Sequence, residues 1–239
     1  MRKRLVFVVA LALLSACGQS NTAPVSTGAA TATSADASYR AAVAEVTKLT
    51  AKANENTMLA PWHGPYGGVP PWDQVKAGLF PATFELGLSL LSAEVDVIAL
   101  NPQPPTFANV IAALEDSGRH EGRAETLFGV LTGNLNTEDV QAVDREWSPK
   151  ITAAYDKITF NDKLFARIAA VYAERGNTGL TAEQKRLLER TYEQYIRAGA
   201  KLSPDQKKRL GAINQELAVA FTDFEIGRAS CRERVYVLV

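Results

Sequence analysis

Apolar residues recur at helical spacing along most of the chain, and the clearest example lies in residues 105–136. Two sets of apolar residues follow this spacing, one on each side of residues 118–122: Phe107, Val110, Ile111 and Leu114, then Ala124, Leu127, Phe128 and Leu131. Such a stripe is normally buried against other helices. Thr106 is a good N-cap residue, and the two prolines before it stop any preceding helix. The pattern predicts one long helix, or two helices broken near residues 118–122, and we expect this segment to organise the fold.

The same spacing predicts helices over most of the remaining chain, and therefore an all-α fold. The expected helices cover residues 38–56, 78–100, 137–158, 162–174, 181–198 and 203–224. Pro149 lies inside one of them, where we expect a kink. The apolar residues expected to be buried in the second and the last of these helices are Phe84, Leu88, Leu91, Val95 and Ile98, and Leu210, Ile213, Leu217, Phe221 and Phe224.

The last two helices have clear start signals. Thr181 with Gln184, and Ser203 with Gln206, have the spacing of a capping box, in which side-chain and backbone groups bond each other reciprocally. A proline at the first helical position strengthens the second signal. Because residues 199–202 form only a short link, we expect the two helices to make an antiparallel hairpin.

Residues 60–73, APWHGPYGGVPPWD, interrupt the helical pattern. Their prolines and glycines exclude a regular helix, so the segment is expected to be a loop. It nevertheless carries large aromatic side chains, which usually pack on a surface. Two interpretations stay open: a structural strap laid across the helices, or a loop that lines a binding cleft.

The first residues have the pattern of a lipoprotein signal peptide. A basic start at residues 2–4 is followed by an apolar run at residues 5–14 that is too short to span a bilayer. The sequence LSAC at residues 14–17 resembles a bacterial lipobox, in which small residues precede a cysteine that receives a lipid. The alternative is an ordinary signal peptide with a chance cysteine.

This pattern predicts how the protein is anchored. We expect residues 1–16 to be removed, Cys17 to be the lipid attachment site, and residues 17–38, rich in small and polar residues, to form a flexible tether. The protein would then lie in the cell envelope, lipid-anchored in the periplasm or at the outer membrane of a Gram-negative bacterium.

The pattern changes again after Phe224. Residues 225–239, EIGRASCRERVYVLV, are basic and then apolar without a helical stripe, and the first eleven match the translation of a common sequencing adapter. We expect a non-native tail, so that the helical region spans residues 39–224 and the natural protein continues differently. The alternative is a native tail with an exposed Cys231.

Charge and cysteine usage exclude two classes of function. The 26 basic and 26 acidic residues balance over the whole chain, and residues 17–224 are mildly acidic, so no nucleic-acid partner is expected. Both cysteines, Cys17 and Cys231, lie in the two unusual ends. Residues 39–224 therefore have neither a disulfide framework nor a thiolate metal site.

The residues that could carry chemistry do not form a known catalytic pattern. His120 and Glu121 begin like the zinc-protease helix motif His-Glu-x-x-His, but Ala124 stands where the second histidine is needed to grip the metal. We therefore predict no catalytic residue and no metal ligand, and we expect His120 to be exposed among its charged neighbours. His63, in the proline-rich loop, is expected to be a packed or exposed side chain and not a ligand.

Two stretches carry a resemblance to a known family, residues 60–75 and 128–150, and the order of the helices and residues 200–224 support it. Together they resemble the N-terminal part of the thimet oligopeptidase and peptidyl-dipeptidase family of zinc metallopeptidases. The resemblance implies a helical, two-lobed fold with an active site deep in a channel that admits short peptides. It also implies zinc-assisted hydrolysis by a His-Glu-x-x-His motif that belongs to the C-terminal half of the family.

The chain as given is therefore expected to be a truncated, inactive front half of such an enzyme, which holds no zinc itself. Its apolar faces would lack the partner half, so we expect it to aggregate or to be only partly stable. The alternative is a non-catalytic helical lipoprotein that binds a peptide or protein partner.

Overall fold

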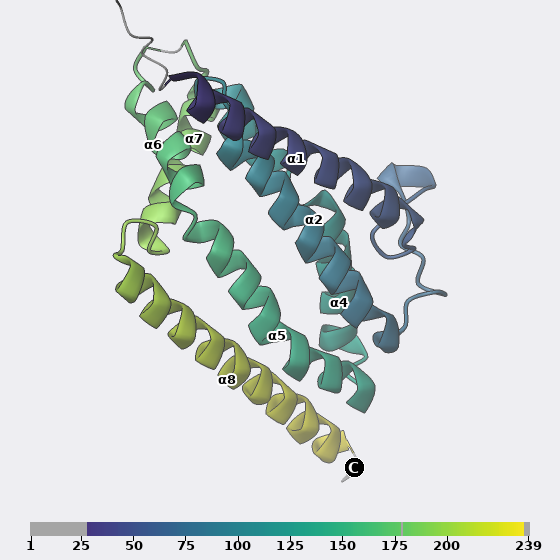
Figure 1. Cartoon of the computed structure of the whole chain (residues 1–239). Helices are drawn as coiled ribbons and strands as arrows, with labels where there is room; N and C mark the ends of the chain where they lie inside the picture. Colours follow the sequence, from purple (N-terminus) through teal and green to yellow (C-terminus); the bar gives the residue numbers. More distant parts are fainter. Residues whose placement is uncertain (1–27, 178, 237–239) are drawn as a thin grey trace, which may run out of the picture.

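The computed structural model describes residues 28–177 and 179–236, and within these residues the chain is helical without a strand, as predicted (Figure 1). The elements in chain order are α1 (Gly28–Glu55), η1 (Pro65–Gly67), η2 (Ala77–Leu79), α2 (Phe80–Leu100), η3 (Phe107–Ala112), α3 (Ala113–Asp116), α4 (Arg119–Asn134), α5 (Glu138–Thr159), α6 (Asp162–Ala173), α7 (Ala182–Arg197) and α8 (Pro204–Tyr236). In this part of the chain, no helix combines the length and hydropathy needed to cross a bilayer.

Helix α2 is the centre of the fold. Helices α1, α4, α5 and α6 all pack on it, and in Figure 1 it lies between α1 and α5. Its buried residues point in several directions around the helix axis: Phe80, Thr83, Phe84, Gly87, Leu90, Leu91, Ala93, Val95, Ile98 and Ala99. A helix that is apolar on most sides must be surrounded by other elements. Residues 105–136 therefore do not organise the fold as expected, because they pack on α2.

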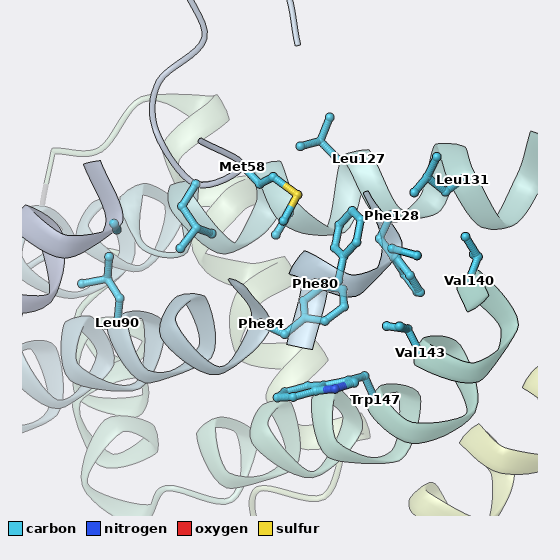
Figure 2. Packing of buried hydrophobic residues seen from close by; sticks show 14 of the residues in the cluster. Met58, Phe80, Phe84, Leu90, Leu127, Phe128, Leu131, Val140, Val143 and Trp147 are labelled. Carbon is cyan, nitrogen blue, oxygen red and sulfur yellow. The ribbon is translucent and has the colours of Figure 1, made fainter. Parts of the chain in front are cut away.

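The main core forms where α2, α4 and α5 meet. The ring centroid of Phe84 lies 5.2 Å from that of Phe128 in α4 and 5.6 Å from that of Trp147 in α5. The ring centroid of Phe80 lies 4.8 Å from that of Phe128. Figure 2 shows these rings converging with Met58 and Leu127 above them. Aromatic contacts at these distances stabilise a core beyond the area that they bury. A second cluster joins the far end of α2 to η3, α6 and α7.

The stretch 105–136 contains two helical segments, which confirms the second of the two predicted alternatives. Thr106 and Asn109 bond each other reciprocally at the start of η3, which is a π-helix. The break lies at Gly118, which has φ 75° and donates its backbone N–H to Glu94 of α2 at 2.7 Å. Glycine adopts this left-handed conformation without strain.

The predicted helix starts at Thr181 and Ser203 are confirmed, since both side chains cap their helices and Gln184 and Gln206 bond back. The prediction that these two helices form an antiparallel hairpin is wrong. Helix α7 packs on α6, whereas α8 packs along α5 (Figure 1). Helix α8 lies along α5 because side-chain hydrogen bonds attach it to α5 and to the start of α6. One of them joins Asn214 to Asp156 at 2.8 Å.

Several predicted helix ends differ from the structure. Helix α1 begins at Gly28, so residues 28–38 of the expected tether are helical. Helix α8 continues beyond Phe224 to Tyr236, and α5 runs through Pro149 as one helix. Leu210 and Ile213 of α8 are partly buried, but Leu217, Phe221 and Phe224 are exposed and not buried as expected.

Candidate functional site between α2, α4 and α5

Glu121, an acidic residue, lies inside the core. It lies three residues before Ala124 and seven before Phe128, and so falls on the apolar side of α4. Its side chain is only 1% exposed, and neither carboxyl oxygen has a hydrogen-bond partner in the described part of the chain. Burial of an unpartnered polar group is costly, so such a group is a candidate for function.

Gly87 of α2 makes room for this carboxyl. A Cβ atom at Gly87 would lie 2.0 Å from Oε2 of Glu121 and 3.3 Å from a methyl group of Leu59. The absence of a side chain therefore lets α4 approach α2 closely at this point. Next to it, Arg123 donates to the backbone carbonyl of Leu59 at 2.6 Å, which ties α4 to the turn after α1.

The electrostatics of the site favour protonated carboxyls. Burial, and then the charge of Glu125 one helical turn away, raise the pKa of Glu121 to about 8. Burial also raises the pKa of Glu125, against the opposing effect of a hydrogen bond from the Tyr155 hydroxyl of α5. Burial and the two carboxylates in turn raise the pKa of Tyr155. At neutral pH the innermost group is thus a neutral acid.

A cavity of about 320 Å³ lies beside Tyr155. Its walls come from α2, α5 and α7 and from the break before α4, with Leu91, Gly118 and Tyr195 among the lining residues. Burial raises the pKa of Tyr195 to about 12, so its hydroxyl stays protonated at neutral pH. A mostly apolar cavity lined by Tyr195 can hold an apolar group, and a phenol hydroxyl can donate a hydrogen bond to a polar atom attached to that group.

The residues of α4 do not fit a zinc site. Nε2 of His120 lies 3.2 Å from Oδ1 of Asn54 on α1, whereas Glu121 points at Gly87 and Ala124 is completely buried. Among the residues described, no group of three histidine, cysteine or acidic side chains could hold a metal ion. We therefore derive no step through zinc from this chain. His120 is half-buried and its pKa is lowered by burial and by Arg123, so the expectation that it is exposed was wrong.

The loop of residues 60–73 divides its aromatic side chains between core and solvent. Trp62 is partly buried and packs against the main core, which favours the strap interpretation. Tyr66 is fully exposed and has φ 59°, an uncommon value for a residue with a side chain. His63 is exposed, and its backbone carbonyl accepts a hydrogen bond from Val69. The predicted lipid site, Cys17, lies outside the described residues.

The chain is similar to curated proteins over 155 of its residues. The dipeptidyl carboxypeptidase of Escherichia coli (strain K12) is 35% identical over 155 residues, which are 65% of this chain and 23% of that protein. The dipeptidyl carboxypeptidase of Salmonella typhimurium (strain LT2) is 31% identical over 155 residues, with the same two shares. This chain is homologous to dipeptidyl carboxypeptidases. No family model matches it.

These matches cover only part of the length of the relatives. The matched region spans less than a quarter of either carboxypeptidase. The homology agrees with the resemblance noted in the sequence of residues 60–75, 128–150 and 200–224.

The sequence carries a signal for the buried acid. The spacing of Glu121 from Ala124 and Phe128 places it on the buried stripe of α4, although the same residue also stands in an incomplete zinc motif. Tyr155 gave no such signal, since its proximity to Glu125 depends on how α4 and α5 pack.

Replacement of Gly87 by alanine is expected to destabilise the fold by about 1–3 kcal/mol, because the new methyl group collides with the Glu121 carboxyl. In an ordinary helix interior the same change stabilises by about 1 kcal/mol. Urea unfolding of Gly87→Ala, Glu121→Ala and the double variant measures this coupling. Additive effects of the two substitutions would show that the carboxyl does not occupy this space.

The buried acid also predicts a pH dependence. Between pH 4.5, the ordinary pKa, and about 8, the folded protein holds a proton on Glu121 that the unfolded chain releases. The free energy of unfolding should therefore fall as pH rises through this window, by at most about 1.4 kcal/mol per pH unit. Glu121→Gln cannot ionise and should flatten the slope, whereas Glu85→Gln, at an exposed position of α2, should retain it. Equal slopes for all three proteins would contradict a protonated Glu121.

Proposed function

We propose that this chain is the helical N-terminal part of a zinc peptidase that hydrolyses short peptides. The observation that carries the proposal is the 35% identity to a dipeptidyl carboxypeptidase over 155 residues. The all-helical fold supports it, because the resemblance implies a helical enzyme. In this proposal the relatives' activity on peptides extends to the full-length protein and not to the chain alone.

The role proposed for these residues is structural, as a wall of the peptide channel. The described residues bring no metal-binding group together, and His120 and Glu121 point to different neighbours. Zinc and the residues that hold it would then be supplied by a part of the enzyme with no counterpart in this chain. The alternative is a helical lipoprotein that binds a partner. Every observation that fits this alternative also fits the peptidase proposal.

The purified chain is expected to bind no stoichiometric zinc and to release no dipeptide from short peptides. Zinc content after dialysis is measured by atomic absorption, and dipeptide release by mass spectrometry, with the Escherichia coli dipeptidyl carboxypeptidase as the positive control. One tightly held zinc per chain, or turnover above that of a His120→Ala variant, would contradict the proposal that another part of the enzyme supplies the zinc site.

We also propose that a lipid on Cys17 anchors the protein in the cell envelope of a Gram-negative bacterium. The pattern of residues 1–17 is the support: a basic start, a short apolar run and small residues before the cysteine. Acyl chains contribute about 0.8 kcal/mol per buried CH₂, so several chains on one cysteine would hold a protein at a membrane.

Expression in a Gram-negative host is expected to place the protein in the membrane fraction, and Cys17→Ser is expected to release it. Labelling with radioactive palmitate checks that lipid is attached, and Cys231→Ser is the matched control because it leaves the signal intact. Lipid anchoring would be ruled out if the Cys17→Ser variant stayed in the membrane fraction and neither this variant nor the unaltered protein incorporated the palmitate label.

A further inference from the structure

The cavity of about 320 Å³ lies where the break between α3 and α4 meets α2, α5 and α7. Its most buried lining residues are Leu91 and Val95 of α2, which are 6% and 2% exposed. Ser117 and Gly118 line it at the break. Ligand-binding cavities in proteins begin at about 300 Å³, so this space is large enough for one small molecule.

Hydrogen bonds hold the wall at the break in place. The backbone N–H of Gly118 donates to Glu94 at 2.7 Å. The hydroxyl of Ser117 donates to the backbone carbonyl of Leu114 at 2.7 Å. Gly118 also lies close to α2, since a Cβ atom there would be 3.2 Å from a methyl group of Leu91. A wall that is fixed before a ligand arrives lowers the entropic cost of binding.

The lining of the cavity is uncharged. Among the described residues that line it, none is acidic, basic or a histidine. Apolar side chains such as Leu114 and Ile158 are accompanied by the hydroxyl and amide groups of Thr159, Gln194 and Tyr195. A charged ligand would lose its hydration here without gaining an opposite charge, which is costly. The lining therefore favours a neutral ligand that is mostly apolar.

The polar side chains of the lining determine which polar group suits the ligand. Burial raises the pKa of Tyr195 to about 12, so its phenol remains a hydrogen-bond donor at neutral pH. The ring of Tyr195 stacks on that of Phe165, with 6.5 Å between the centroids. The amide of Gln194 can also donate. A carbonyl oxygen, which only accepts hydrogen bonds, is the group that fits these donors.

We propose that this cavity binds a small neutral molecule in which an apolar ring carries a carbonyl group, such as an aromatic amide. The inference goes beyond the proposed function and does not rest on it, because it uses only the lining of the cavity. The same uncharged lining disfavours ligands that carry a carboxylate, an ammonium or a phosphate group.

The test uses the full chain and two probes that share a fluorinated ring and differ in charge. 4-Fluoro-N-methylbenzamide is neutral, whereas 4-fluorobenzoate carries a carboxylate at pH 7. A fluorine NMR titration is expected to show saturable binding of the amide with a dissociation constant of about 1 mM, as is ordinary for a probe of this size. The benzoate should bind at least tenfold more weakly. No saturable binding of the amide, or equal binding of both probes, would overturn the proposal.

A substitution at Ala198 tests whether the amide binds in this cavity. Ala198 is exposed and lines the cavity at the end of α7, so Ala198→Phe adds a ring there without altering the core. The new ring is expected to weaken amide binding at least tenfold. The control is Ala182→Phe, at an exposed position at the start of the same helix, which should leave the affinity unchanged. Unchanged affinity of Ala198→Phe would place the probe elsewhere and overturn the proposal.

Tyr195→Phe tests the hydrogen bond, because it removes the hydroxyl and keeps the ring that stacks on Phe165. Loss of one hydrogen bond is expected to weaken amide binding by about two- to tenfold. The control is Tyr192→Phe on the same helix, whose hydroxyl oxygen accepts from Lys201 and does not line the cavity. Equal affinity of Tyr195→Phe and the unaltered chain would overturn the assignment of a carbonyl-bearing ligand. This comparison remains decisive if circular dichroism shows that Ala198→Phe does not fold.

Discussion

The fold depends on the burial of α2 on most of its sides. A helix that carries Phe84 toward one neighbour and Val95 toward another cannot remain at a surface, so α1, α4, α5 and α6 must surround it. The aromatic contacts of Phe84 with Phe128 and Trp147 then determine where α4 and α5 lie. The remaining elements follow from these positions, because η3 and α6 extend the same core toward the other end of α2.

The approach of α4 to α2 at Gly87 places an acidic residue inside the core. Gly87 lets α4 come near enough for Glu121 to lie inside the core, and the low polarity there keeps the acid protonated at neutral pH. The carboxyl forms no hydrogen bond with a described residue, so it costs stability where an apolar residue would not. The acid is buried against Gly87, whereas the imidazole of the preceding residue, His120, lies against Asn54.

Helix α8 is held in place by polar contacts with α5 and the start of α6. Hydrogen bonds at Lys207 and Asn214 hold its polar side against α5 and the start of α6, where burial requires that each polar group find a partner. Leu217 and Phe221, three and seven residues after Asn214, lie near these contacts along the helix and are exposed.

The sequence by itself determined the helices and several of their ends. Caps at Thr181 and Ser203, and the break at Gly118, act within a few residues, so local chemistry is enough to predict them. The apolar stripe that places Glu121 in the core was also readable, although an incomplete motif hid it. Only the tertiary structure decided that α2 is central, that α8 packs on α5 and not on α7, and that Tyr155 meets Glu125. These results depend on contacts between residues far apart in the chain, where the packing of several helices and not the pattern of one selects the partner.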